Sequence, residues 1–157
     1  MPAPTASRTP GPPCPGLPYP VPARPPRVSL DLGAILTAPG CARAWTRQIL
    51  REWRLAHLAD DAEAIVGELV ANSVSASQRL DRPGSPAIRL ILTLERGELA
   101  VLVRDDHPGG PQRKAPGAYE ENGRGLLLVE ALSTRFGWYP LEGGGKVTWA
   151  GFTGAPS

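Results

Sequence analysis

The chain has 157 residues, 41% of them hydrophobic, which is the size and composition of one globular domain with an ordinary core. Its net charge is +2, and its cations are nearly all arginines, since lysine occurs only at Lys114 and Lys146. The four arginines of residues 43–54 are spaced along one expected helix, which favours a solvated helix face over a nucleic-acid site. Cys14 and Cys41 fit neither a metal-binding spacing nor a disulfide framework.

The first 26 residues hold eleven of the nineteen prolines and few large apolar side chains. Such a segment buries too little surface to offset the entropy lost on ordering, so residues 1–26 are predicted to be a disordered proline-rich tail. Residues 27–153 are predicted to form the folded domain. No run approaches the length of a transmembrane helix, and the N-terminus lacks the apolar stretch of a signal peptide. The sequence therefore predicts a cytoplasmic protein without membrane contact.

The folded domain is expected to begin with a strand and a helix. Apolar and polar residues alternate from Val28 to Leu32, which predicts a strand with one buried face. Pro39 and Gly40 are expected to break the chain before the first helix. Its apolar positions recur at helical spacing and are Ala42, Trp45, Ile49, Trp53 and Ala56.

A second helix is predicted over residues 60–77. Asp60 followed by Glu63 is a capping-box arrangement at its start. Glu68 and Asn72 lie one turn apart and therefore share a face of this helix. The adjoining stripe that would be buried against a sheet consists of Ile65, Val66, Leu69, Val70 and Val74.

Two hairpins and a third helix complete the prediction. Residues 87–94 and 98–104 are expected to form one hairpin, and residues 136–140 and 146–152 another. The long segment 107–122 has no periodicity and is interpreted as a lid or binding loop before a buried third helix. This order predicts an α/β two-layer sandwich, in which three helices cover one face of a mixed, mostly antiparallel sheet.

Several polar groups suggest chemistry, and each also has a purely structural interpretation. The amide oxygen of Asn72 suits Mg²⁺, and the Glu68 carboxylate suits a base acting on a hydroxyl. Asp105 ends an apolar strand and either accepts a hydrogen bond from an exocyclic amine or caps a turn. Gly123-Arg124-Gly125 either presents backbone N–H groups to phosphate or forms a tight loop before a core helix.

The stretch Gly143-Gly-Gly-Lys-Val147 has a superficial likeness to a phosphate-binding loop. A Walker motif needs a glycine where Pro140 stands and a serine or threonine where Val147 stands. The stretch is also expected to enter a strand, whereas a Walker loop enters a helix. A Walker-type site is therefore rejected.

The order and spacing of four motifs resemble the GHKL (Bergerat-fold) ATP-binding superfamily, and within it the bacterial anti-sigma-factor serine kinases. The resemblance covers about residues 28–152, and Ala42-Arg43 of the first helix also fits it. In chain order, the motifs are Glu68-Leu-Val-Ala-Asn72 for the N-box, Val103 to Pro111 for the first glycine box, Gly123 to Val129 for the second, and Gly145 to Trp149 for the last strand.

This resemblance implies that the protein binds ATP with Mg²⁺ and transfers the γ-phosphoryl to a serine on a protein partner. Glu68 would be the catalytic base, Asn72 would hold Mg²⁺, and Asp105 would bind the adenine amino group. The implied partners are an anti-sigma antagonist and a sigma factor, with a homodimer left open. The further nucleotide contacts that the resemblance implies are Gly109, Gly123, Arg124, Gly125, Leu126 and Thr148.

The motifs also depart from the family pattern. The N-box continues as Ser73 to Ser77 without the usual histidine, and His107 stands where a glycine is usual. Asp106 adds a second carboxylate, so either aspartate is a candidate for the adenine ligand. The alternative function is a non-catalytic, nucleotide-dependent module that sequesters a partner protein. A histidine-kinase catalytic domain ranks third, because the chain shows no dimerisation helices or phospho-accepting histidine segment.

Overall fold

The computed structural model describes residues 26–80, 87–109 and 121–153. The helices and strands follow one another in the predicted order, with one additional short 3-10 turn, η1, between the first two helices. The elements are β1 (Arg27–Gly33), α1 (Ala38–Glu52), η1 (Ala56–Leu58), α2 (Ala59–Gln78), β2 (Ala87–Glu95), β3 (Glu98–Asp105), α3 (Glu121–Leu132), β4 (Arg135–Pro140) and β5 (Lys146–Thr153).

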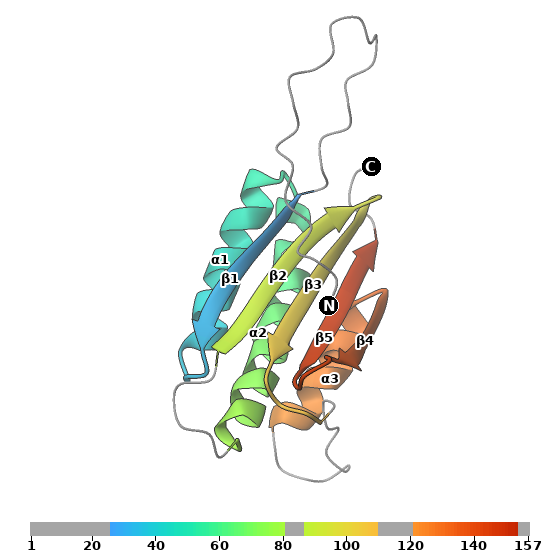
Figure 1. The fold of residues 1–157 in the computed structure, drawn as a ribbon. Helices are drawn as coiled ribbons and strands as arrows, with labels where there is room; N and C mark the ends of the chain where they lie inside the picture. The colour runs from blue at the N-terminus through green and yellow to red at the C-terminus, as the bar shows by residue number, and fades with distance from the viewer. Residues whose placement is uncertain (1–25, 81–86, 110–120, 154–157) are drawn as a thin grey trace, which may run out of the picture.

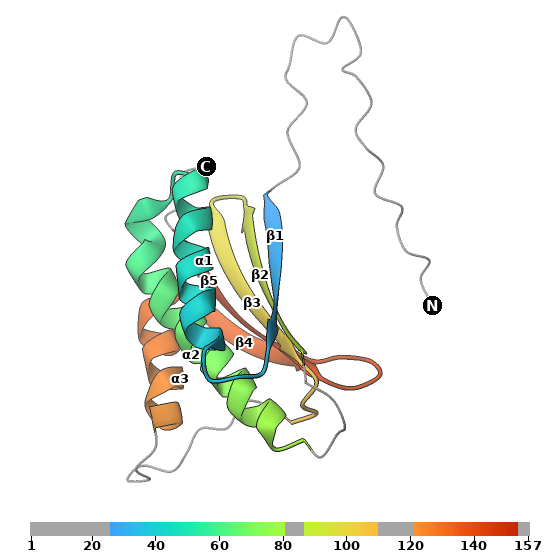
Figure 2. The ribbon, with the colours of Figure 1, turned by 90° about the vertical axis from the view of Figure 1, so that its left-hand side faces the viewer.

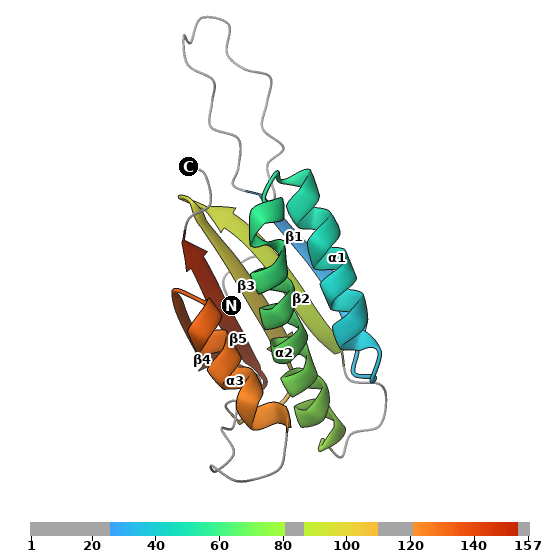
Figure 3. The same ribbon diagram turned by 180° about the vertical axis from the view of Figure 1, so that it is seen from behind.

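The strands form one five-stranded sheet in the order β1-β2-β3-β5-β4. Every neighbouring pair is antiparallel, so the predicted mostly antiparallel sheet is antiparallel in all its described pairings. Figure 2 shows the three helices together on one side of this sheet, and Figures 1 and 3 show the open and the helix-covered face. The predicted two-layer α/β sandwich is confirmed.

The helix-facing side of β3 and of its neighbour β5 is apolar along most of its length and polar at one end. Leu99, Val101 and Val103 of β3 are fully buried, as expected for alternate residues on one face of a strand. The next residue in that row is Asp105, which is 1% exposed. Its partner across the ladder is Lys146, the first residue of β5. The strand alternation therefore carries two ionisable side chains into the layer between sheet and helices.

Helix α2 lies centrally over the sheet, between α1 and α3 (Figure 3). The predicted apolar stripe of this helix is buried throughout, with no member more than 4% exposed. Burial of each such side chain is worth about 1.5–3 kcal/mol, so the stripe fixes the rotation of α2 about its axis. That rotation decides where the polar residues of its second half point.

The starts of the helices differ from the predictions. α1 already begins at Ala38 and includes Pro39 in its first turn, where proline needs no hydrogen-bonded N–H. No side chain caps α2, which begins at Ala59. The predicted capping box is wrong, because Arg47 of α1 takes both carboxylates: its Nη2 lies 2.8 Å from Asp60 Oδ1 and also contacts Glu63. These bonds raise the pKa of Arg47, with Glu63 contributing most.

Two predicted segments lie wholly or largely outside the described residues. The proline-rich tail falls in residues 1–25, apart from its last residue, and most of the expected lid loop falls in residues 110–120. Within the described ranges, no helix combines the length and the apolar character needed to cross a membrane.

Candidate functional site

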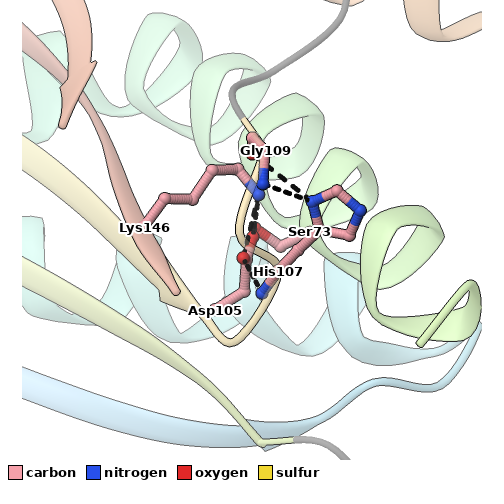
Figure 4. A network of polar contacts seen from close by, with 5 residues as sticks. All are labelled: Ser73, Asp105, His107, Gly109 and Lys146. Atoms are coloured by element: carbon pink, nitrogen blue, oxygen red, sulfur yellow. Dashed lines mark hydrogen bonds and ion pairs between the residues drawn. The ribbon is translucent and has the colours of Figure 1, made fainter. Parts of the chain in front are cut away.

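The polar end of β3 is a hydrogen-bonded cluster centred on the Asp105 carboxylate (Figure 4). Lys146 Nζ lies 2.8 Å from Asp105 Oδ1 and 2.7 Å from Oδ2. The hydroxyl of Ser73 on α2 donates to Oδ2 at 2.6 Å, and the backbone N–H of His107 donates to Oδ1 at 2.9 Å. Asp105, Lys146 and Ser73 are all at most 3% exposed, so this is a buried ion pair reinforced by neutral donors.

The turn between β4 and β5 brings Lys146 to this carboxylate. Gly143, Gly144 and Gly145 all have positive φ, at 84°, 108° and 90°, a backbone region that favours glycine. A Cβ on Gly145 would also overlap the backbone carbonyl oxygen of Asp105. The three glycines therefore allow β5 to begin immediately against the end of β3. The run leads into a strand, as the rejection of a Walker loop anticipated.

His107, which stands where the resemblance expects glycine, folds back on its own loop. Its Nδ1 accepts a hydrogen bond from the N–H of Gly109 at 3.1 Å. The same nitrogen lies 3.4 Å from Gly109 O, but it cannot donate there while it accepts from Gly109 N–H. The imidazole thus closes a local turn with Gly109 (Figure 4).

Asp105 and Asp106, the two candidate aspartates, differ in burial. Asp105 is buried at the centre of the cluster, whereas Asp106 is partly exposed in the bend after β3. Thr148, another predicted site residue, is 5% exposed and lies on the same face of β5 as Lys146, opposite Val103. The structure therefore brings Thr148 and Asp105, rather than Asp106, to the helix-covered side of the sheet.

A second contact joins the predicted base to the predicted phosphate motif. Gly125 of α3 is buried so closely against α2 that a Cβ there would overlap the carboxylate of Glu68. Leu126, the next residue, is 3% exposed. Asn72 is half-buried and follows Glu68 by one turn on α2. One helix thus holds Glu68 beside α3 and Ser73 beside Asp105, with Asn72 between them in the chain.

The glycine motif itself lies inside the helix rather than before it. α3 begins at Glu121, so Gly123 and Arg124 belong to its first turn. The first four N–H groups of a helix have no partner within it and lie at the positive end of its dipole. This start of α3 is therefore suited to an anion beside Glu68. Among the described residues, no group of three or more His, Cys, Asp and Glu side chains could hold a metal ion.

Sequence reasoning missed three members of the Asp105 cluster. From the sequence, Ser73 and His107 stand out only as departures from a pattern. Lys146 stands out only as a member of the rejected loop and of the last-strand motif, without a role of its own. The alternation of β5 contains a usable signal, because Lys146 is in register with Thr148, Ala150 and Phe152 on its buried face. Ser77, a further turn along α2, has a buried hydroxyl without a hydrogen-bond partner among the described residues.

Comparison with known proteins identifies a family and a group of similar solved structures. Residues 36–152 match the model of a family described as histidine kinase-like ATPase domain. Among solved structures, the chain is similar to the RsbU and RsbW domains of Rv1364c from Mycobacterium tuberculosis, with 21% identity and a TM-score of 0.57. That match covers 82% of this chain but 32% of the other, so the likeness concerns the fold. No curated protein matches the chain.

Proposed function

Because this chain belongs to the histidine kinase-like ATPase domain family, we propose that it is a protein serine kinase that uses Mg-ATP. Membership agrees with the family expected from the four sequence motifs and implies ATP as the ligand. The transfer to a serine, the magnesium ion and the protein partner are the parts of the proposal that go beyond the family.

The observation that carries the proposal is the position of Glu68 against Gly125. It places a carboxylate against the fifth residue of α3, next to the first turn, whose unpaired backbone N–H groups are suited to phosphate oxygens. On the same helix, Ser73 contacts Asp105, the residue that the resemblance assigns to adenine. α2 therefore spans both ends of the proposed nucleotide site, and Gly125 fits because any side chain there would displace Glu68.

In the proposed reaction, a Glu68 carboxylate oxygen accepts the proton of the incoming serine hydroxyl. The serine oxygen then forms a bond to the γ-phosphorus while the bond to the β–γ bridging oxygen breaks, and ADP leaves. Mg²⁺, held by the Asn72 amide oxygen and water, would neutralise charge on the phosphates. Gly123, Arg124, Gly125 and Leu126 would bind phosphate through the start of α3, with Gly109 and Thr148 near the base.

The protein partner follows from the resemblance to anti-sigma-factor kinases. We infer an antagonist protein that carries the acceptor serine and a sigma factor as second partner, with both encounters in the cytoplasm and a homodimer left open. Arg43 of α1 is an exposed cation whose guanidinium lies across Gly67 of α2, the residue that precedes Glu68 in the chain. It is the residue at which we would first look for contact with an acidic partner segment.

The nucleotide site is tested by titrating Mg-ATP against wild type and Asn72→Ala by calorimetry. We expect Mg-dependent binding to weaken about tenfold or more in the variant, which corresponds to about 1.4 kcal/mol or more. Gln78→Ala, which removes an exposed amide from the end of the same helix, is the matched control and should bind as wild type. Negligible binding in all three proteins would overturn the proposal.

Phosphoryl transfer is tested with γ-labelled ATP and candidate antagonist proteins. Glu68→Gln keeps the size of the side chain but removes the base, so transfer should fall by about 10²–10⁴-fold while ATP still binds. Asp61→Asn removes an exposed carboxylate from the first turn of the same helix and should leave transfer unchanged. If a partner binds wild type but never becomes labelled, the non-catalytic sequestering module replaces the kinase.

A further inference from the structure

The Asp105 carboxylate has no acceptor position left for a base. A carboxylate offers about four lone-pair sites. Here Lys146 Nζ lies within 2.8 Å of both oxygens, and Ser73 Oγ and the His107 N–H take one site each. An adenine amino group needs one of these lone-pair sites, but all four are already occupied by donors of the protein.

The four contacts are not equally easy to move. The His107 N–H belongs to the turn that follows β3, and Ser73 is held on the buried face of α2. Lys146 occupies two of the four sites through a single ammonium group on a four-carbon stem. Its third N–H has no acceptor among the described residues and can donate to a ligand. The position of Lys146 therefore determines whether a base meets a free acceptor on Asp105 or a donor from the lysine.

The glycine turn shows that this placement of Lys146 is built into the backbone. All three residues before it have positive φ, and Gly145 lies directly against the Asp105 backbone. Lys146 is also the register partner of Asp105, so the two side chains leave neighbouring strands toward the same face. The glycines at 143–145, which superficially resemble a phosphate-binding loop, thus serve to position the Lys146 ammonium group beside Asp105 at the end of β3.

We propose that Lys146 is a specificity-determining residue of the nucleotide site. Lys146 pairs with both oxygens of Asp105, so the carboxylate no longer accepts a hydrogen bond from the exocyclic amine of the base. The remaining N–H of Lys146 instead donates to an acceptor atom on the base. The purine is then bound with little contribution from its 6-amino group. This inference rests on the proposed function, because it takes the region around Asp105 as the base-binding end of the ATP site.

The test compares ATP with purine riboside 5′-triphosphate, which differs by lacking the 6-amino group. In wild type with Mg²⁺, calorimetric dissociation constants for the two should agree within about threefold. A hydrogen bond from the amine to an unshared carboxylate would instead favour ATP by about tenfold or more. This first comparison uses the unaltered protein and does not depend on the folding of any variant.

Two substitutions then assign the effect to Lys146. Lys146→Met keeps the length of the side chain but frees two acceptor positions, so its preference for ATP should rise to about tenfold or more. Lys146→Arg retains a cationic donor and should stay within about threefold, as in wild type. Circular dichroism of each variant at the temperature of the titration establishes that it is folded.

Each outcome decides the matter. A preference for ATP of about tenfold or more in wild type overturns the inference but keeps the ATP site, whatever Lys146→Met shows. A small preference in both wild type and folded Lys146→Met overturns the role of Lys146 as well. Binding of neither nucleotide to wild type overturns the proposed function together with the inference, and this result is distinct from the other two.

Discussion

Two ion pairs of this sheet have the same geometry and opposite surroundings. Asp31 on β1 lies directly opposite Arg89 on β2, and Asp105 on β3 lies directly opposite Lys146 on β5. Arg89 Nε donates to Asp31 at 2.7 Å, the same distance as Lys146 Nζ to Asp105 Oδ2. The first pair is 51% and 65% exposed, whereas the side chains of the second are 4% and 0% exposed.

The difference shows what burial does to the same interaction. At the surface, water solvates both charges whether or not they touch, so the pair adds little to stability. Between sheet and helices, each charge has lost its water and depends on its partner and on further donors such as Ser73. Replacing such a pair by apolar residues is often neutral, so its presence in the core is weak evidence of a gain in stability. Here the pair lies at the strand end where ligand recognition is expected.

The largest expected effect comes from breaking the buried pair. Lys146→Met leaves an uncompensated carboxylate in the core and should lower the free energy of unfolding by about 3–5 kcal/mol, as measured by urea denaturation. The matched control is Arg89→Met, which breaks the exposed pair and should hardly move the urea midpoint. The double variant Lys146→Met/Asp105→Leu should regain part of the loss, because no unpaired charge is left. Equal effects at the two sites would contradict the comparison.

A smaller effect is expected from the turn that delivers Lys146. Gly145→Ala forces a Cβ into a positive φ and against the rigid carbonyl of Asp105. Backbone strain alone costs about 1–3 kcal/mol, and the overlap adds to it, so the thermal midpoint should fall clearly. Gly143→Ala has a positive φ with open space around it, which isolates the strain from the overlap. If both variants lose the same stability, the close approach to Asp105 is unimportant.

The smallest effect should depend on pH. The hydrogen bond from Arg89 lowers the pKa of Asp31 below its ordinary value of 3.8. The exposed pair therefore stabilises the fold above pH 3.8 and loses this contribution as the pH falls through the lowered pKa. The slight difference between wild type and Arg89→Met in urea should accordingly vanish in strong acid. A difference that grows on acidification would have the wrong sign.

Most of the fold could be predicted from the sequence because its signals are local. Strand alternation, helical spacing in α2 and the glycine-containing turns each depend on neighbouring residues, and the element order was correct throughout. The helix starts were less accurate. Asp60 and Glu63 were assigned to a cap, but Arg47 of another helix binds both, and a single-helix pattern contains no information about that partner.

By itself, the sequence determined the two-layer fold, the family motifs and the shared face of Glu68 and Asn72, since these follow from periodicity and spacing along the chain. The tertiary structure decided which groups meet. It alone placed Glu68 against Gly125 and enclosed Asp105 among Ser73, His107 and Lys146. The partners of Asp105 come from a helix, a turn and the last strand, and only the packing of the helices on the sheet fixes their distances.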